Sequence, residues 1–161
     1  MAKKKIVKKQ QKETAIAVNR RAFFNYEILK RFEVGIMLTG TEIKSVRDNK
    51  VDLRDAYAKD IKGEMWLFNS HISTYVNATI NNHDPKRDRK LLLHKEQINE
   101  LSLTVSRKGY TLIPLKIYFK RSRAKLELGL ATGKRQYDKR RVLKDREMDR
   151  EAQRALKSYG N

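Results

Sequence analysis

An unusually long alternation of apolar and polar residues most limits the folds open to this chain. In YEILKRFEVGIML, residues 26–38, the apolar side chains fall on one side of a two-residue period that only Lys30 interrupts. They are Tyr26, Ile28, Phe32, Val34, Ile36 and Leu38. The pattern predicts a half-buried β-strand longer than the usual range of roughly 3 to 10 residues. We expect it to bend at Gly35 and to serve two parts of a curled sheet, as a small barrel requires.

Short helices are predicted on both sides of this strand and again later in the chain. In AVNRRAFF, Asn19 is a candidate N-cap, because its carboxamide oxygen can accept a bond from a first-turn amide. In TGTEIKSVRDNK we expect Thr41 as the N-cap, Glu42 in the first turn and an end near Asn49. A third helix fits HKEQINELSLTVSRKG, with Gly109 as its C-cap.

A hairpin is predicted in DAYAKDIKGEMWLFNSHIS, with its turn at Lys62 and Gly63. Its second strand carries Trp66, Phe68 and Ile72 on one face. After it, the Asn-rich and charged stretch that contains NNHDPKRDRK predicts an exposed loop.

Two closing strands, TLIPLKIYFK and AKLELGLAT, are joined by the basic turn RSR, and Pro114 indicates an edge or a bulge. The predicted fold is therefore mainly β, a small antiparallel barrel of the oligonucleotide-binding (OB) type with two or three short helices. We divide the chain into a basic, disordered N-terminal arm at 1–13, the barrel at 14–132 and a basic tail at 133–161.

The charge of the chain indicates a polyanionic partner. The 161 residues include 38 Lys and Arg against 19 Asp and Glu, a formal net charge of +19. Nucleic acid is the leading candidate, and an anionic membrane is the weaker one because no broad apolar face with aromatic anchors is present. Zero cysteines exclude disulfides and thiolate chemistry. No apolar run follows the basic start, so we expect a cytoplasmic protein.

The sequence changes character after Gly133, where GKRQYDKRRVLKDREMDREAQRAL combines dense positive charge with little apolar surface. A helix from Val142 onward aligns Arg146, Arg150 and Arg154 at four-residue spacing beside a narrow apolar stripe. Because isolated helices of this length are marginal and like charges repel, we expect the tail to be largely unfolded when free. An anionic groove would neutralise the arginines and order the helix. The alternative is a charged helix that docks on the body or stays solvated.

Two other classes of function are alternatives to a non-catalytic RNA-binding protein: an RNA-cleaving enzyme and a ribosomal protein. Glu33, Glu42, Asp52 and Asp55 offer carboxylates for metal-assisted RNA cleavage, but their spacing matches no metal motif. His71, His83 and His94 form no recognisable ligand pair, so we expect no enzyme and no cofactor. A constitutive rRNA-binding ribosomal protein stays open, because a basic barrel with a basic tail describes many of them.

Five stretches together carry a resemblance to a known family. They are AVNRRAFFNYEI, GTEIKSVR, DPKRDRKLLLHKEQI, KGYTLIPLKIYFK and GKRQYDKRRVLKDRE, in this order over nearly the whole chain. The chain resembles the small protein B (SmpB) family, the bacterial SsrA-binding proteins of trans-translation. The resemblance implies an OB-like barrel that binds the tRNA-like domain of tmRNA (SsrA) and delivers it to stalled ribosomes. It also implies that the tail senses the empty mRNA channel near the decoding site of the small subunit.

The resemblance assigns residues to both surfaces. On the tmRNA side they are Asn19, Arg20, Glu33, Glu42, Lys44, Ser45, Arg47, Leu92 and Lys125. On the ribosome side the matching block is Lys134, Arg135, Tyr137, Asp138, Lys139 and Arg140, to which we add the arginine row at 146, 150 and 154. The family further implies a monomer that acts, through tmRNA, with elongation factor Tu and alanyl-tRNA synthetase.

Several of these residues also allow a different interpretation. Lys44 and Arg47 lie one helical turn apart and can grip adjacent phosphates. Glu42 can accept bonds from a base edge or a ribose hydroxyl, orient a neighbouring arginine, or serve only as a helix-start carboxylate. For Leu92 we expect core support of the RNA-facing loop, and Tyr137, where many relatives have His, can stack on a base or pack on the barrel edge.

Overall fold

The long alternating stretch forms one of three long strands in a closed antiparallel sheet. The computed structural model describes residues 15–78, 82–107 and 109–158, so the predicted arm at 1–13 lies outside the described residues. The strands are β1 (Ala15–Val18), β2 (Tyr26–Ile36), β3 (Val51–Asp52), β4 (Tyr57–Ile61), β5 (Glu64–Phe68), β6 (His71–Ile72), β7 (Arg89–Leu92), β8 (Tyr110–Lys120) and β9 (Arg123–Gly133). The helices are α1 (Arg20–Asn25), α2 (Gly40–Arg47), α3 (Lys95–Val105) and α4 (Gln136–Ser158).

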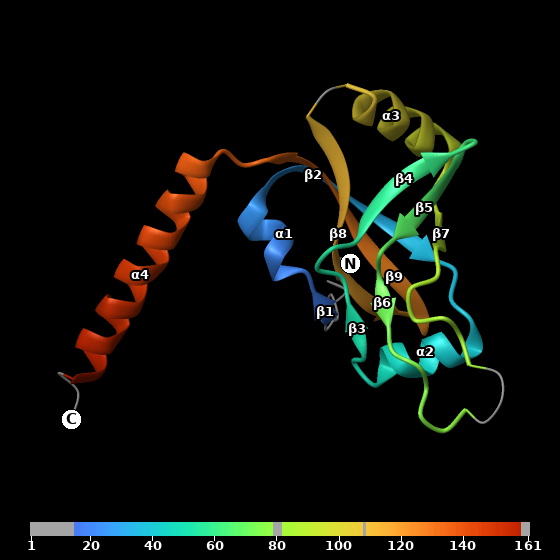
Figure 1. Ribbon diagram of the computed structural model, residues 1–161, viewed down its shortest axis with the longest axis horizontal. Helices are drawn as coiled ribbons and strands as arrows, with labels where there is room; N and C mark the ends of the chain where they lie inside the picture. Colours follow the sequence, from blue (N-terminus) through green and yellow to red (C-terminus); the bar gives the residue numbers. More distant parts are fainter. Residues whose placement is uncertain (1–14, 79–81, 108, 159–161) are drawn as a thin grey trace, which may run out of the picture.

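The sheet closes on itself because β8 pairs with strands on both of its sides. Its order is β1-β8-β4-β5-β7-β2-β9, and β9 pairs back with β8. β3 and β6 form a separate small sheet. Figure 1 shows α2 and α3 at opposite ends of the curled sheet and α1 on its outside. The predicted OB-like barrel with short helices is confirmed.

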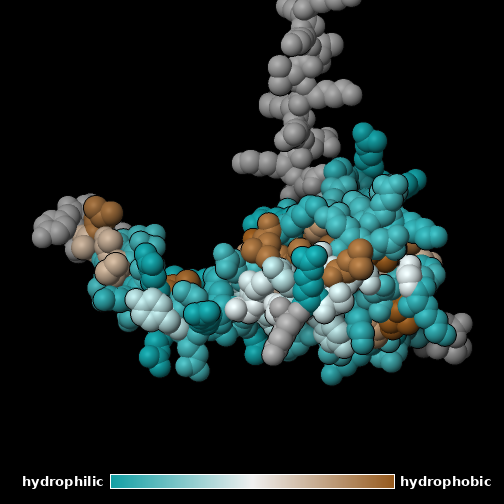
Figure 2. Space-filling view, turned by 90° about the horizontal axis from the view of Figure 1, so that it is seen from above, coloured by the Kyte–Doolittle hydropathy of each residue, from teal (hydrophilic) through white to brown (hydrophobic). Residues whose placement is uncertain are grey.

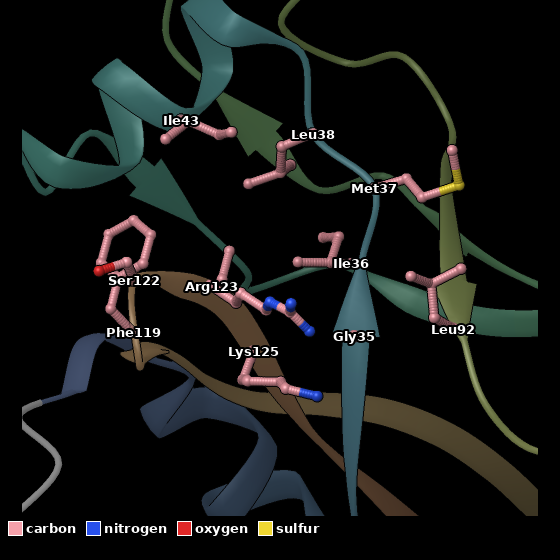
Figure 3. A pocket seen from close by; sticks show the side chains of 11 residues that line it. Gly35, Ile36, Met37, Leu38, Ile43, Leu92, Phe119, Ser122, Arg123 and Lys125 are labelled. Carbon is pink, nitrogen blue, oxygen red and sulfur yellow. The ribbon is translucent and has the colours of Figure 1, made fainter.

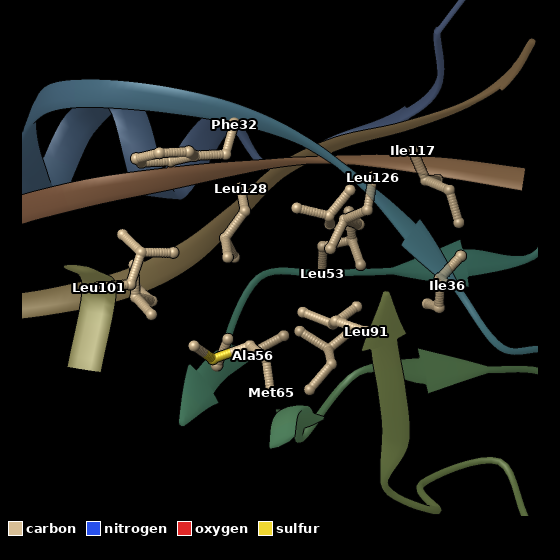
Figure 4. Close-up of a cluster of buried hydrophobic side chains, with 14 of the residues drawn as sticks. Phe32, Ile36, Leu53, Ala56, Met65, Leu91, Leu101, Ile117, Leu126 and Leu128 are labelled. Carbon is tan, nitrogen blue, oxygen red and sulfur yellow. The ribbon is translucent and has the colours of Figure 1, made fainter. Parts of the chain in front are cut away.

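The core fills the inside of the curled sheet. Side chains from opposing strands point toward one another in Figure 4, among them Phe32 of β2, Leu91 of β7 and Leu126 of β9. The two end helices each add to this core, α2 through Val46 and α3 through Leu101, both fully buried. Burying both ends this way leaves the outer faces of the strands and helices for other molecules.

Local sequence signals explain several elements. Asn19 caps α1, since its side-chain oxygen accepts from the amide of Ala22 at 3.0 Å. Lys62 and Gly63 form the predicted hairpin turn, both with positive φ angles of 53° and 79°, as a type I′ turn requires. The register of β8 against β9 shifts between Pro114 and Lys116, which confirms the predicted bulge.

Several predicted details are wrong. Thr39, not Thr41, caps α2, because Glu42 must be the third helical residue for its carboxylate to reach back to the Thr39 amide at 2.7 Å. α3 ends at Val105, before the predicted C-cap at Gly109.

The second strand of the hairpin, β5, points the face between its aromatic residues into the core. Met65 and Leu67 are fully buried, whereas Trp66 and Phe68 are only partly buried on the outer face. Ile72 belongs to another strand, β6. The aromatic side chains are therefore left on the surface of the barrel.

The tail forms a helix that begins earlier than predicted, at Gln136 instead of Val142. Figure 1 shows α4 projecting away from the barrel, and Figure 2 shows a hydrophilic helix with hydrophobic atoms gathered near its far end. Whether this helix persists when the protein is free stays a prediction.

Candidate nucleic-acid interface

A groove of about 410 Å³ lies where the end of β2 meets β7, α2 and the turn between β8 and β9. Its apolar lining includes Ile36, Leu92 and Phe119, and Arg123 and Lys125 of β9 supply positive charge. Figure 3 shows the side chains of Arg123 and Lys125 on the same side of the groove, across from Leu92. An apolar floor with cations beside it suits a ligand that has both flat rings and phosphates.

Gly35 and Leu92 shape one wall of this groove. A Cβ atom on Gly35 would lie 3.1 Å from Cβ of Leu92, closer than most Cβ contacts, so a larger residue here would push β7 outward by a few tenths of an ångström. Leu92 itself is 51% exposed. The expectation that Leu92 only supports the core is therefore wrong, because its side chain is a lining residue of an open groove.

Two cations of α2 lie over aromatic rings, and one of them, Arg47, borders the groove. Arg47 lies with its guanidinium 5.6 Å from the ring centre of Phe119, which lines the groove. Lys44 lies with Nζ 5.1 Å from the ring centre of Tyr75. Both cations are exposed, and such cation–π contacts hold them over apolar surface while their hydrogen-bond donors stay available. The structure thus brings Arg47, Leu92 and Lys125 to one site, with Lys44 on the same helix.

Glu33 of β2 stands among cations, two residues before Gly35. Its carboxylate accepts from the hydroxyl of Tyr118 and from Nζ of Lys120, each at 2.7 Å. The bonds from Lys120 and Tyr118 outweigh partial burial and lower the pKa of Glu33 below its usual value. Glu33 is therefore an ionised, exposed acceptor beside the basic turn, able to receive a bond from a base edge or a hydroxyl.

Glu42 is fully buried and holds two arginines. It accepts from Nε and Nη2 of Arg87 at 2.7 Å and 2.6 Å, and from Nε of Arg89 at 2.9 Å. Burial alone would raise the pKa of Glu42, but the bonds from Arg87 and the Thr39 amide and the charges of both arginines lower it. Of the roles considered for Glu42 from the sequence, the geometry supports the one in which it orients neighbouring arginines.

Glu42, Arg87 and Arg89 form a cluster that we call the Glu42 hub. It connects the loop before β7 to α2. Arg89 is fully buried and donates further bonds from Nη1 to the carbonyl of Ser70 at 2.8 Å and from Nη2 to the carbonyl of Pro85 at 3.1 Å. His83 adds a second tie, with Nδ1 2.9 Å from the hydroxyl of Thr41. The loop predicted as exposed therefore turns two of its arginines inward, because a buried carboxylate needs them.

Two other residues assigned to RNA binding are buried. Asn19 caps α1 and donates to the carbonyls of Leu53 at 2.7 Å and Pro114 at 3.0 Å. Ser45 lies on the inner side of α2 at 0% exposure. Arg20, by contrast, is exposed on α1, and it is not one of the described residues that line the groove. In this conformation Asn19 and Ser45 contribute to packing. Direct contact with RNA would come from the exposed residues around them.

The tail residues also divide by position. Lys134 is an anchor: its amide donates to the carbonyl of Asn25 at 2.9 Å and its Nζ donates to the carbonyl of Phe23 at 3.1 Å. Arg146 lies over the ring of Phe24, 5.6 Å from its centre. The remaining assigned residues lie along α4 or just before it, and all but the half-buried Lys139 are exposed: Arg135, Tyr137, Asp138, Arg140, Arg150 and Arg154.

Tyr137 is 77% exposed and does not pack on the barrel edge. Its ring is therefore open to a partner.

The carboxylates considered for metal catalysis lie apart or are already paired. Asp52 accepts from Arg54 at both oxygens, at Oδ1 from Nε at 3.1 Å and at Oδ2 from Nη2 at 2.5 Å, and Asp55 pairs with Arg21 at 2.8 Å. Within the described ranges, no group of three or more His, Cys, Asp or Glu side chains is placed to hold a metal ion. In the same part of the chain, no helix combines the length and the apolar character that crossing a membrane requires.

Sequence reasoning missed Phe119 and Arg123 in the groove and Arg87 and Arg89 in the hub. One signal was present for the hub. In RDRKLLL, residues 87–93, the alternation that buries Leu91 continues backward to Arg89 and Arg87. Charge masked this alternation, because arginine is rarely fully buried without a partner.

Comparisons with known proteins agree on one family. The family model described as SmpB protein matches residues 16–158. An SsrA-binding protein of Ligilactobacillus salivarius is 50% identical over 155 residues, which is 96% of this chain and all of that protein. One from Allorhizobium ampelinum is 52% identical over 144 residues, 89% of this chain and 91% of that protein.

A solved structure described as tmRNA–SmpB at the centre of the bacterial ribosome is similar in sequence and fold. Its matched chain is 47% identical, with a TM-score of 0.64, over 79% of this chain and 93% of that chain.

Proposed function

Because this chain belongs to the SmpB protein family, we propose that it binds the tRNA-like domain of tmRNA and brings it to stalled ribosomes for trans-translation. The relatives named above are SsrA-binding proteins, and the similar solved structure is a tmRNA–SmpB complex of the bacterial ribosome. They do not favour the alternative of a constitutive ribosomal protein.

The observation that carries the proposal is the groove with its apolar floor and its surrounding cations. Arg123 and Lys125 line it, and Arg47 borders it through Phe119. We propose that these cations contact phosphates of the folded transcript, while Glu33 accepts a bond from a base or ribose. The Glu42 hub positions α2 and the loop before β7 and acts on RNA only through them.

The tail acts separately in this proposal. Its exposed cations and Tyr137 bind rRNA in the mRNA channel when no message fills it, so the tail distinguishes stalled from translating ribosomes. The protein works without catalysis, as a monomer in the bacterial cytoplasm, and tmRNA links it to elongation factor Tu and alanyl-tRNA synthetase.

The test is affinity for a transcript of the tRNA-like domain, measured by fluorescence anisotropy. The double variant Arg47→Ala with Lys125→Ala should bind about tenfold or more weakly, because two charge-assisted contacts are lost. Lys30→Ala is the matched control, since Lys30 pairs with Glu100 of α3 at the other end of the barrel. Equal affinity of the double variant and the control would refute the groove as the binding site.

A further inference from the structure

The outer face of β4, β5 and β7 carries aromatic side chains that the proposed function leaves unused. Along β5 the buried residues are Met65 and Leu67, and the alternate positions point outward. Trp66 is one of them and is partly exposed. Phe68, next on this face, stacks on Tyr57 of β4 with ring centres 5.4 Å apart. This is the one stacked pair of aromatic rings among the described residues. The ring of Trp66 therefore has no stacking partner among them.

Cross-strand register places a lysine on each side of Trp66. Trp66 lies opposite Lys59 of β4 and opposite Lys90 of β7. Lys59 is exposed, and the side chain of Lys90 is 33% exposed and forms an ion pair with Glu64. Directly opposed residues on one face have their Cβ atoms roughly 5 Å apart, so both ammonium groups can reach the surroundings of the ring.

This outer face is continuous with the groove. Leu92 follows Lys90 by two positions in β7 and therefore lies on the same side of the strand. It also lines the groove, on the wall next to Gly35. The row that begins at the groove with Leu92 thus continues through Lys90 to Trp66. A nucleic acid that leaves the groove along β7 would meet the aromatic ring next.

We infer that this face binds an unpaired segment of RNA, with Trp66 as the surface on which a base stacks and Lys59 and Lys90 beside its phosphates. Unpaired bases have open ring faces, and stacking on an aromatic side chain is tolerant of sequence. A duplex covers those faces, so the ligand is single-stranded. The charge also fits, because two lysines flank the ring on a chain of net charge +19. The inference rests on the proposed function only in taking RNA as the partner, and it names a second site.

The chain provides its own probe for this site, because Trp66 is its one tryptophan. The experiment is a titration of the full-length protein with a short oligouridylate, followed by tryptophan fluorescence. We expect saturable quenching, since a stacked base contacts the indole directly. Heparin, a polyanion without bases, should compete for the lysines without quenching. Absence of quenching by oligouridylate, or equal quenching by heparin, would overturn the inference.

Variants that keep Trp66 locate the site. Lys59→Ala and Lys90→Ala should each weaken the quenching titration about three- to tenfold at low salt, because each removes a phosphate contact. Lys116→Ala is the matched control: its side chain is 36% exposed and pairs with Glu127, as that of Lys90 pairs with Glu64, but it lies on β8. Equal weakening by Lys116→Ala would overturn the inference.

The same variants separate this inference from the proposed function. Lys59→Ala and Lys90→Ala should leave affinity for the tRNA-like transcript within about threefold, whereas the groove variants lower it. If quenching is absent while binding at the groove is intact, only the inference of a second site is refuted. Groove variants that bind normally remove the proposed function and leave the quenching result to stand by itself.

Discussion

The barrel and the tail carry the same kind of charge but hold it in different ways. In the barrel, glutamates fix many of the cations, as Glu42 does with Arg87 and Arg89 and Glu33 does with Lys120. Every ion pair between described residues joins two residues of the barrel. In α4 the cations are mostly exposed, and one of them, Arg146, contacts the ring of Phe24.

This difference indicates two modes of recognition. The Glu42 hub holds α2 and the loop before β7 in place, so the barrel presents a surface formed in advance, which suits a folded RNA. A helix whose arginines face solvent has little to hold it in place and takes its shape from its surroundings. We therefore expect substitutions in the barrel to change its stability and substitutions at the base of the tail to change the placement of α4.

The largest effect on the barrel should come from Glu42→Gln. The substitution leaves Arg87 and the fully buried Arg89 without their anionic partner, which costs about 3–5 kcal/mol for a buried pair. Urea denaturation measures the free energy of unfolding. Glu33→Gln, which breaks an exposed pair, is the matched control and should cost no more than about 1 kcal/mol. Equal losses would mean that the hub does not organise the barrel.

Acid should weaken the barrel through the same carboxylate. Because the pKa of Glu42 is lower in the folded protein than in the unfolded chain, its contribution is present above the unfolded value of about 4.3. It is lost as the pH falls through the folded value. We expect the Tm to change little between pH 7 and about pH 5 and then to fall.

The matched measurement is the Tm of Glu42→Gln over the same pH range. Its fall should be shallower, though not absent, because the pKa values of Glu33 and Asp52 are also lowered by their partners. An identical profile for both proteins would show that Glu42 does not titrate in this way.

The tail offers the smallest of these effects. Phe24→Leu removes the aromatic ring under Arg146, a contact at an exposed site that is worth about 0.5–1 kcal/mol. The stability of the barrel should stay nearly unchanged, whereas the position of α4 relative to α1 should become less restricted. The distance distribution between spin labels on the two helices measures this. A distribution as narrow as that of the original chain would show that other contacts fix the tail.

The sequence predicted what local patterns determine. The alternation at 26–38, the cap at Asn19 and the turn at Lys62 and Gly63 each follow from neighbouring residues, and each is present. These features suffice to build a curled antiparallel sheet, so the fold class followed from them.

Features that depend on distant partners could not be predicted in this way. Arg87 and Arg89 face inward because Glu42, more than forty positions earlier, lies buried between them. The same pairing requires Glu42 to stand third in its helix, which moves the cap to Thr39. Leu92 lies on the outer face of β7 because Leu91 points into the core, and its position against Gly35 of β2 requires the folded sheet.

The most direct test of two separate recognition surfaces is a chain that ends at Lys134, which keeps the anchor to Asn25 and Phe23 and removes α4. Affinity for the tRNA-like transcript and rescue of ribosomes stalled on truncated messages are measured on the same preparation. We predict affinity within about threefold of the full chain and loss of rescue. Rescue by the shortened chain, or loss of transcript binding while the barrel stays folded, would contradict the account.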